Sequence, residues 1–308
     1  MVHRLSKFML PFACVCAVAT AAPAAASASY ATGISDDGGA MFTNKYFTGL
    51  NFTTARYTVF WNVAVMKNKS ALNATRAWLA AAKTARVAPL ISFVADYGNA
   101  GNYIPSTKVY TAAIKAFIQD FPQVKLYTPW NEPDWVYRPG LARHPALAAS
   151  YYNALVANCR GCTVAAGDLY LPNPQLGSYI RQYRRYLHGR PKAWALHNYY
   201  DVRTHTTGQL RTLQSLTSGQ IWLTEISGVL RRGHWQFRNQ SAAAAGRDES
   251  FLFSLPKRFH RLARIYHYQW QGELAGPNSG WDSGLLSAFG ATRPSYNAVK
   301  KAIGVRQR

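Results

Sequence analysis

Tyr127-Thr-Pro-Trp-Asn-Glu-Pro-Asp-Trp135 joins the end of a short apolar segment to a carboxylate, an amide and indole rings. The apolar segment predicts a strand over residues 125–130. Pro129 cannot donate a ladder hydrogen bond, so regular strand should end just before it, and Asn131 and Glu132 should lie on the rim of a sheet. A functional site on this rim would need partners from other strands.

Strand-like and helix-like segments alternate along the rest of the 308 residues. Eight such units match the usual size of a (β/α)8 barrel. The alternative, an open doubly wound sheet, would carry a Gly-rich dinucleotide turn after its first strand, and the sequence has none there. We therefore expect one α/β domain, a single (β/α)8 TIM barrel. Its expected strands are 30–35, 55–63, 88–95, 125–130, 163–170, 193–199, 221–226 and 264–271. Its clearest expected helices are 72–85, 106–121, 142–157, 174–187, 208–216 and 295–303.

The N-terminus has the pattern of a secretory signal. A basic start that includes Arg4 and Lys7 precedes an uncharged apolar run over 8–22, and Ala26-Ser27-Ala28 fits a signal-peptidase site. A retained membrane anchor is the alternative, but the apolar run is short for a span. We expect a signal peptide over 1–28, a secreted mature domain over 29–308, and no membrane span after the signal is removed.

Cysteine use is consistent with export. Cys14 and Cys16 would leave with the signal, and Cys159 and Cys162 would remain. In a secreted protein such a pair is most simply a local disulfide. A thioredoxin-like redox pair would open a helix, whereas this pair follows a predicted one. The sequence therefore predicts a disulfide between Cys159 and Cys162.

The charge is strongly positive, with 35 Lys and Arg against 13 Asp and Glu and a net of +22. Such an excess attracts nucleic acid, anionic cell-wall polymers or acidic polysaccharides. The basic residues are spread along the chain, with short clusters over 181–185 and 257–264, and no nucleic-acid motif is present. We expect weak adhesion to anionic cell-wall polymers and no specific nucleic-acid partner.

The chain has only four glutamates, and two of them fall where barrel chemistry is found. Active sites of (β/α)8 barrels lie at the C-terminal ends of the strands. Glu132 follows the fourth expected strand and Glu225 ends the seventh, whereas Glu249 and Glu273 lie in a helix and a loop. Strands four and seven face each other across the barrel mouth. Two opposed carboxylates, one protonated and one ionised, are what cleavage of a glycosidic bond requires.

Other strand ends carry polar and aromatic groups. Most of the tryptophans also fall at strand ends or in the loops that follow them, a bias that a carbohydrate-binding cleft explains and core packing does not. For the acidic residues near strand ends, including Asp36, Asp37 and Asp168, substrate contact and turn capping are equal alternatives. The candidate substrate-binding residues are Arg56, Trp61, Trp130, Asn131, His197, Tyr199 and Trp270, and the further loop tryptophans are Trp135, Trp235 and Trp281.

Other chemistries find no motif. There is no Gly-x-Ser-x-Gly elbow, no phosphate-binding loop and no His-Glu-x-x-His, and the eight histidines show no ligand spacing. We expect no metal and no cofactor.

The chain resembles clan A of the glycoside hydrolases, the retaining (β/α)8 enzymes related to families five and thirty-nine. The matching pieces are Trp130-Asn-Glu-Pro133, His197-Asn-Tyr199, Thr224-Glu225, Trp270, Gly284-Leu-Leu and Arg293-Pro-Ser-Tyr-Asn-Ala298, which together span most of the mature chain.

The resemblance implies a role for each matched residue. Glu132 would be the general acid/base and Glu225 the nucleophile. Asn131 would bind the sugar 2-hydroxyl, and Tyr199 would hold the nucleophile. His197 would line the cleft, and Trp270 would be the platform under the sugar. The resemblance also implies that Arg56, near the start of the second expected strand, supports the charge of Glu225.

These roles imply a retaining β-glycoside hydrolase that cleaves a polysaccharide by double displacement. With the predicted signal peptide we expect it to be secreted, and we expect a monomer. Retention predicts carboxyl groups about 5–5.5 Å apart. The loop tryptophans favour several sugar subsites and hence endo action. Two alternatives share these residues: a barrel that binds carbohydrate without cutting it, and a transglycosylase.

Overall fold

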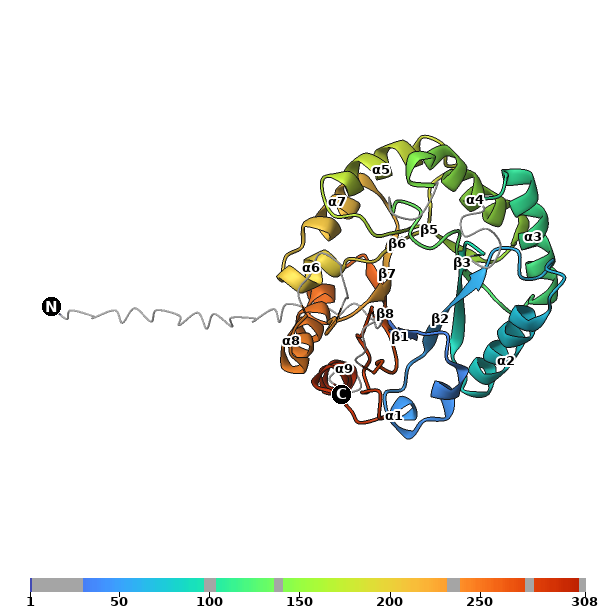
Figure 1. Cartoon of the computed structure of the whole chain (residues 1–308). Helices are drawn as coiled ribbons and strands as arrows, with labels where there is room; N and C mark the ends of the chain where they lie inside the picture. Colours follow the sequence, from blue (N-terminus) through green and yellow to red (C-terminus); the bar gives the residue numbers. More distant parts are fainter. Residues whose placement is uncertain (2–29, 97–103, 136–140, 232–238, 275–279, 305–308) are drawn as a thin grey trace.

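The computed structural model describes residues 1, 30–96, 104–135, 141–231, 239–274 and 280–304, and in it eight parallel strands close into a barrel in chain order. The expected (β/α)8 barrel is confirmed (Figure 1). The expected signal peptide and Trp235 lie outside the described residues. The strands are β1 (Ala31–Ser35), β2 (Thr54–Phe60), β3 (Ala88–Val94), β4 (Leu126–Thr128), β5 (Thr163–Leu169), β6 (Ala193–Leu196), β7 (Gln220–Ile226) and β8 (Leu262–Tyr268).

Helices surround the barrel as an outer ring (Figure 1). The α-helices are α1 (Lys45–Thr48), α2 (Ser70–Thr84), α3 (Thr107–Asp120), α4 (Pro145–Asn158), α5 (Gln175–Arg184), α6 (Tyr199–Thr204), α7 (Gly208–Leu216), α8 (Ala242–Leu252) and α9 (Pro294–Gly304). Short 3-10 turns cover η1 (Gly39–Thr43), η2 (Leu141–Arg143) and η3 (Leu255–Lys257). None of the helices in the described ranges combines the length and hydropathy that crossing a membrane requires.

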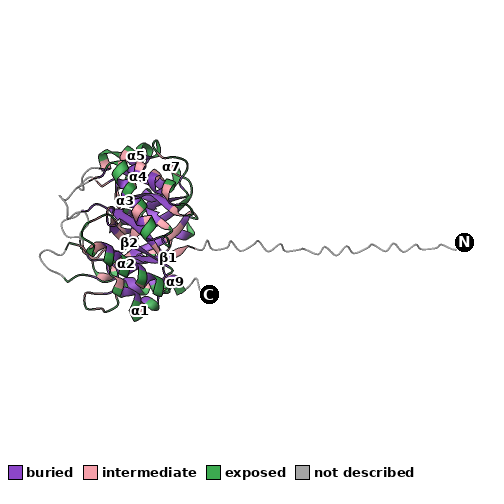
Figure 2. Ribbon diagram, turned by 90° about the vertical axis from the view of Figure 1, so that its right-hand side faces the viewer, coloured by how far each residue is buried: buried purple, intermediate pink, exposed green. Residues whose placement is uncertain are grey.

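The core has two parts, and Figure 2 shows the buried residues concentrated at the centre of the molecule. The larger part lies between the strands and the helices. The smaller part comes from strands alone and fills the barrel interior, where bulky Trp222 and Tyr266 face Ala165, Ala193 and Ala195. This large-against-small packing makes the barrel a solid core that supports its rim.

Six of the eight strands end earlier than expected, and in β6 and β8 the difference moves a candidate site residue. β6 stops at Leu196, so Tyr199 begins the short helix α6. β8 stops at Tyr268 instead of 271, so Trp270 lies beyond the strand. The second difference matters for the site, because residues past a strand end no longer alternate between the barrel interior and the helix layer.

Cys159 and Cys162 form the expected disulfide between α4 and β5. It lies at the N-terminal end of β5, on the opposite side of the barrel from the rim that carries Glu132.

Candidate active site

Glu132 is fixed on the rim by backbone bonds to both neighbouring strands. The N–H of Asn131 donates to the carbonyl of Phe93 at 2.7 Å, and the N–H of Glu132 donates to the carbonyl of Asp168 at 3.0 Å. Glu132 has a φ of +49°, in the left-handed region that non-glycine residues rarely adopt and that often marks functional sites. Its side chain is 11% exposed, so one face remains open to a ligand.

The loop after Glu132 is held by a buried acid. The carboxylate of Asp134 accepts from the backbone N–H of Tyr170 at 2.9 Å and of Leu171 at 3.0 Å. Burial is the largest influence on Asp134 and raises its pKa to about 7, against the lowering effect of the Leu171 hydrogen bond. Asp134 therefore ties the loop after β4 to the end of β5.

The carboxylate of Glu225, on β7, accepts hydrogen bonds from two donors on other elements. The guanidinium of Arg56, fully buried on β2, donates to Glu225 Oε2 at 2.8 Å. The hydroxyl of Tyr199, at the start of α6, donates to Glu225 Oε1 at 3.2 Å. The side chain of Glu225 is 14% exposed. A buried cation and a phenol thus stabilise its charge while leaving it accessible.

The two candidate carboxylates converge as the sequence predicts. One oxygen of Glu132, one oxygen of Glu225 and one nitrogen of His197 all lie within 4.8 Å of one another. A separation of at most 4.8 Å between one oxygen of each carboxylate fits the ~5–5.5 Å between carboxyl groups of retaining glycosidases better than the ~6.5–9.5 Å of inverting ones.

Asp168, at the end of β5, connects the supports of both carboxylates. Its Oδ2 accepts from Arg56 at 3.0 Å, and its Oδ1 faces His197 Nε2 at 3.1 Å. Its φ of +79° is also left-handed. Three hydroxyl groups also donate hydrogen bonds to this carboxylate. They belong to Ser92 on β3, Thr128 on β4 and Thr224 on β7.

The charges in this cluster reinforce one another. Burial opposes ionisation of Asp168, but the charges of Arg56 and His197 outweigh it and hold the pKa of the carboxyl far below its usual range. Burial would lower the pKa of His197, but the charges of Asp168 and Glu225 and the hydrogen bonds to Asp168 and Glu132 raise it to about 10. His197 is therefore an imidazolium at neutral pH, and its Nδ1 donates to Glu132 Oε1 at 3.0 Å.

Glu132, His197 and Glu225 together have the residue types and the spacing of a small metal site. Histidine binds a metal only through an unprotonated nitrogen. In His197 both ring nitrogens face carboxylates, and the pKa of about 10 keeps both protonated at neutral pH. A metal ion at Glu132, His197 and Glu225 would therefore have to displace the proton that His197 donates to Glu132.

Three of the expected substrate-binding tryptophans pack into the core. Trp130 lies against Tyr151, with ring centroids 5.4 Å apart, and Trp270 meets Phe47 edge-on at 5.6 Å. Trp61 is 3% exposed, within the large core cluster. The structure does bring Asn131 to the site, where its Oδ1 accepts from Arg56 at 2.6 Å.

A different set of rings lines the rim from the end of β4 round to β8. Successive ring centroids lie 5.8, 6.4, 5.1 and 6.0 Å apart. Tyr268, the last residue of β8, ends this arc beside Glu225. Burial and the charge of Glu225 raise the pKa of the Tyr268 phenol well above its usual value. We call this set the aromatic arc, and it consists of Trp135, Tyr170, Tyr199, Trp281 and Tyr268.

The sequence profile of the glycosyl hydrolase catalytic core family matches residues 50–298. A comparison with curated protein sequences finds no match.

Solved structures share the fold at low identity. A family 39 glycoside hydrolase from Bacteroides cellulosilyticus WH2 is 15% identical, with a TM-score of 0.63, over 92% of this chain and 65% of that one. GH5_18 from Streptomyces cattleya, in complex with GlcNAc, is 14% identical, with a TM-score of 0.65, over 91% and 80%. Xylanase 10B from Thermotoga maritima is 12% identical, with a TM-score of 0.65, over 92% and 98%. On the strength of the family profile, which covers most of the chain, this protein belongs to the glycosyl hydrolase catalytic core family and is a glycosidase.

Proposed function

We propose that the protein is a retaining β-glycoside hydrolase that uses Glu225 as nucleophile and Glu132 as general acid/base. The observation that carries the proposal is the convergence of the two carboxylates to within 4.8 Å, each held by its own cation. A nucleophile can attack the anomeric carbon directly at this spacing, whereas an intervening water needs a wider gap.

The reaction follows from the two environments. Glu225, ionised beside Arg56 and Tyr199, attacks the anomeric carbon as Glu132 protonates the departing oxygen, and a glycosyl ester forms on Glu225. Glu132, now a carboxylate, takes a proton from water, which attacks the same carbon and releases Glu225. His197 donates to one oxygen of Glu132 throughout, so the catalytic proton is exchanged at the other.

The aromatic arc supports a polymeric substrate. Its rings continue from the loop after β4 to the loop after β8. Tyr199 is buried within the arc, whereas the other four rings are half-buried and can stack sugar rings along the rim. We therefore propose a polysaccharide substrate and endo action, by a secreted monomer. β-Glucans, mannans, xylans and galactans are the candidate polymers, and xylan is the first to test because one similar structure is a xylanase.

The test is hydrolysis of this polymer panel by wild type, Glu132→Gln, Glu225→Gln and Glu273→Gln. Glu273 is an exposed glutamate beyond β8, so its replacement is a matched control. We expect the wild type to cleave at least one polymer, the first two variants to lose activity by about 10³-fold or more, and the control to stay within about twofold. Cleavage that survives Glu225→Gln would refute the assignment.

A further inference from the structure

The two ends of the barrel carry opposite charge patterns. Seven described connections lead from a helix into the N-terminal end of the next strand, and none of them contains an Asp or Glu. Five of the seven carry exposed basic side chains. These include Arg86 before β3, Lys125 before β4, Arg160 before β5, Lys192 before β6 and Lys257 before β8.

The opposite end holds the acids. Besides those of the candidate active site, Asp36, Asp96 and Asp282 lie in connections that follow strands. Asp120, the last residue of α3, is a described acid at the end of a helix that leads toward this face, and it already pairs with Arg76 at 3.7 Å. Among the described connections, the net positive charge is therefore concentrated on the barrel face away from the cleft, which we call the basal face.

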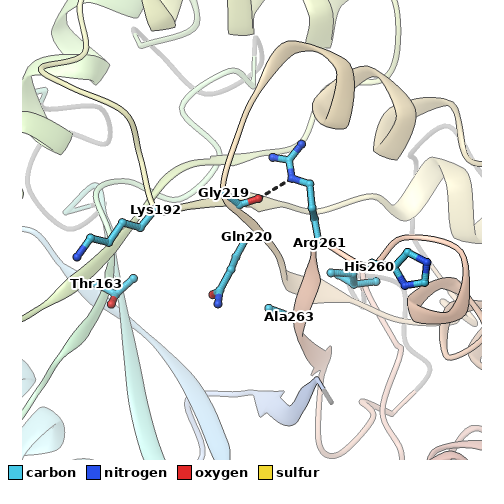
Figure 3. Close-up of a pocket in the computed structure, with 8 residues that line it drawn as sticks. Thr163, Lys192, Gly219, Gln220, His260, Arg261 and Ala263 are labelled. Atoms are coloured by element: carbon cyan, nitrogen blue, oxygen red, sulfur yellow. Dashed lines mark hydrogen bonds between the residues drawn. The ribbon is translucent and has the colours of Figure 1, made fainter. Parts of the chain in front are cut away.

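The basal face also has a recess. A pocket of about 610 Å³ opens at the N-terminal ends of β5 to β8, lined by groups that include Lys192, His260 and Arg261 (Figure 3). The guanidinium of Arg261 is held by backbone carbonyls, with Nε donating to Gly219 at 2.6 Å and Nη1 to Gln214 at 2.9 Å. Its charge is thus fixed at the pocket wall by groups that carry no net charge of their own.

We propose that the basal face binds an anionic polysaccharide and leaves the cleft on the opposite rim free. Basic groups spread over five connections match repeated charges along a polymer better than one small anion, and the attraction of such an array adds up over the chain. The proposal does not depend on the catalytic assignment, because the basal face shares no residue with the candidate site.

The apolar composition of the face favours a hydrophilic polymer. Among the described basal connections, Tyr186 is the only large apolar side chain that is strongly exposed. Insertion into a membrane surface needs several apolar anchors, and binding of single-stranded nucleic acid uses a row of aromatic platforms. An acidic polysaccharide requires neither.

The experiment compares two triple variants with the same loss of charge. The basal variant is Arg160→Gln/Arg190→Gln/Lys192→Gln, and all three side chains are exposed. The control is Lys67→Gln/Lys69→Gln/Arg143→Gln, whose equally exposed side chains lie in connections that follow β2 and β4. Binding to polygalacturonate is measured at increasing NaCl, with dextran as neutral polymer and duplex DNA as a second polyanion, and melting temperatures confirm folding.

We expect wild type to bind polygalacturonate and not dextran, with affinity that falls as salt rises. The basal variant should bind about tenfold more weakly, with a shallower salt dependence, while the control stays within about twofold of wild type. Equal weakening of both variants would show that net charge alone is responsible and would overturn the proposal. Tighter binding to duplex DNA than to polygalacturonate at the same salt would overturn the choice of polymer.

Discussion

Asp168 is the residue on which both halves of the candidate site depend. It pairs with Arg56, which supports Glu225, and with His197, which supports Glu132. Removing its charge should therefore disturb both carboxylates at once. In Asp168→Asn we expect kcat to fall about 10²-fold, because small misplacements of reacting groups carry penalties of that size. We also expect the free energy of unfolding to fall by about 3–5 kcal/mol, because a buried ion-pair network is broken.

The pH–rate profile separates a positioning role from a purely structural one. Without the carboxylate of Asp168 the pKa of His197 falls, so the alkaline limb of kcat/KM should move to lower pH. Asp120→Asn, on the surface of α3, is the control and should leave the profile unchanged. A uniform fall in rate with an unmoved alkaline limb would contradict the positioning role.

The raised pKa of His197 also predicts how stability depends on pH. Folding raises its pKa from 6.5 to about 10, so its ionisation stabilises the fold fully below pH 6.5 and loses this effect as pH rises through about 10. The difference in melting temperature between wild type and His197→Gln should therefore shrink between pH 6.5 and 10. A difference for His197→Gln that widens above pH 7 would count against the charged imidazolium.

Single residues show what the sequence could and could not reveal. Arg56, Asn131 and Tyr199 were predicted near the carboxylates, and they are there, because strand alternation and strand ends place them. The hub role of Asp168 was missed, because an acid near a strand end can equally cap a turn. The signal that could have found it is the pair Gly167-Asp168, a glycine before an acid at the end of a predicted strand. In the structure both residues adopt positive φ.

At the level of elements, the junction between β7 and α8 sets the position of Glu225. Gly228 follows β7 and packs so closely on α8 that an added Cβ would lie 2.1 Å from the carbonyl oxygen of Ala245. Its N–H donates at 2.7 Å to Glu249, a fully buried acid of α8.

Gly228→Ala should therefore push α8 away from β7. We expect a loss of about 1–3 kcal/mol in the free energy of unfolding, typical of overpacking, and a lower kcat because Glu225 shifts. Gly280→Ala is the matched control, since a Cβ there meets no atom within 4 Å. Chemical denaturation of both variants checks the prediction, and equal midpoints would contradict it.

The strands were predicted more accurately than their ends. Apolar runs define a buried strand, whereas its last residue depends on hydrogen bonds to a neighbour far away in sequence. β8 illustrates the consequence: an end placed three residues too late put Trp270 on the rim in place of Tyr268. Trp130 was misassigned for a related reason, since its ring turns to the helix layer beside Tyr110 and Tyr151.

At the level of the whole molecule, α9 completes the helix ring between α8 and α1. Tyr296 of α9 donates its hydroxyl to the carbonyl of Tyr46 in α1 at 3.0 Å, and Val299 is fully buried. Val299→Ala should therefore cost roughly 1–3 kcal/mol in the free energy of unfolding. Val156→Ala, at a half-exposed position on α4, should cost less than about 0.5 kcal/mol. Similar losses in the two variants, measured by urea titration, would show that the C-terminal helix is not part of the cooperative fold.

The barrel as a whole separates its tasks by face. The rim at the C-terminal strand ends holds the paired glutamates, and the basal face holds the excess of cations. The repeating strand–helix pattern made the fold and the position of the rim predictable. Of the aromatic arc, Trp135, Tyr199 and Trp281 were expected at strand ends or in loops. Tyr170, Tyr268 and the order of the five rings were not, because only the closed barrel determines the relative placement of separate loops and strand ends.

The central claim is a covalent intermediate on Glu225, and trapping it is the most direct test. The protein would be incubated with activated 2-deoxy-2-fluoro glycosides of the gluco, manno, xylo and galacto series, then digested and analysed by mass spectrometry. Our account predicts one glycosyl adduct per molecule, on the peptide that contains Glu225, and no adduct in Glu225→Gln. An adduct on another residue, or a hydrolysed polymer whose first product has the inverted anomeric configuration, would contradict it.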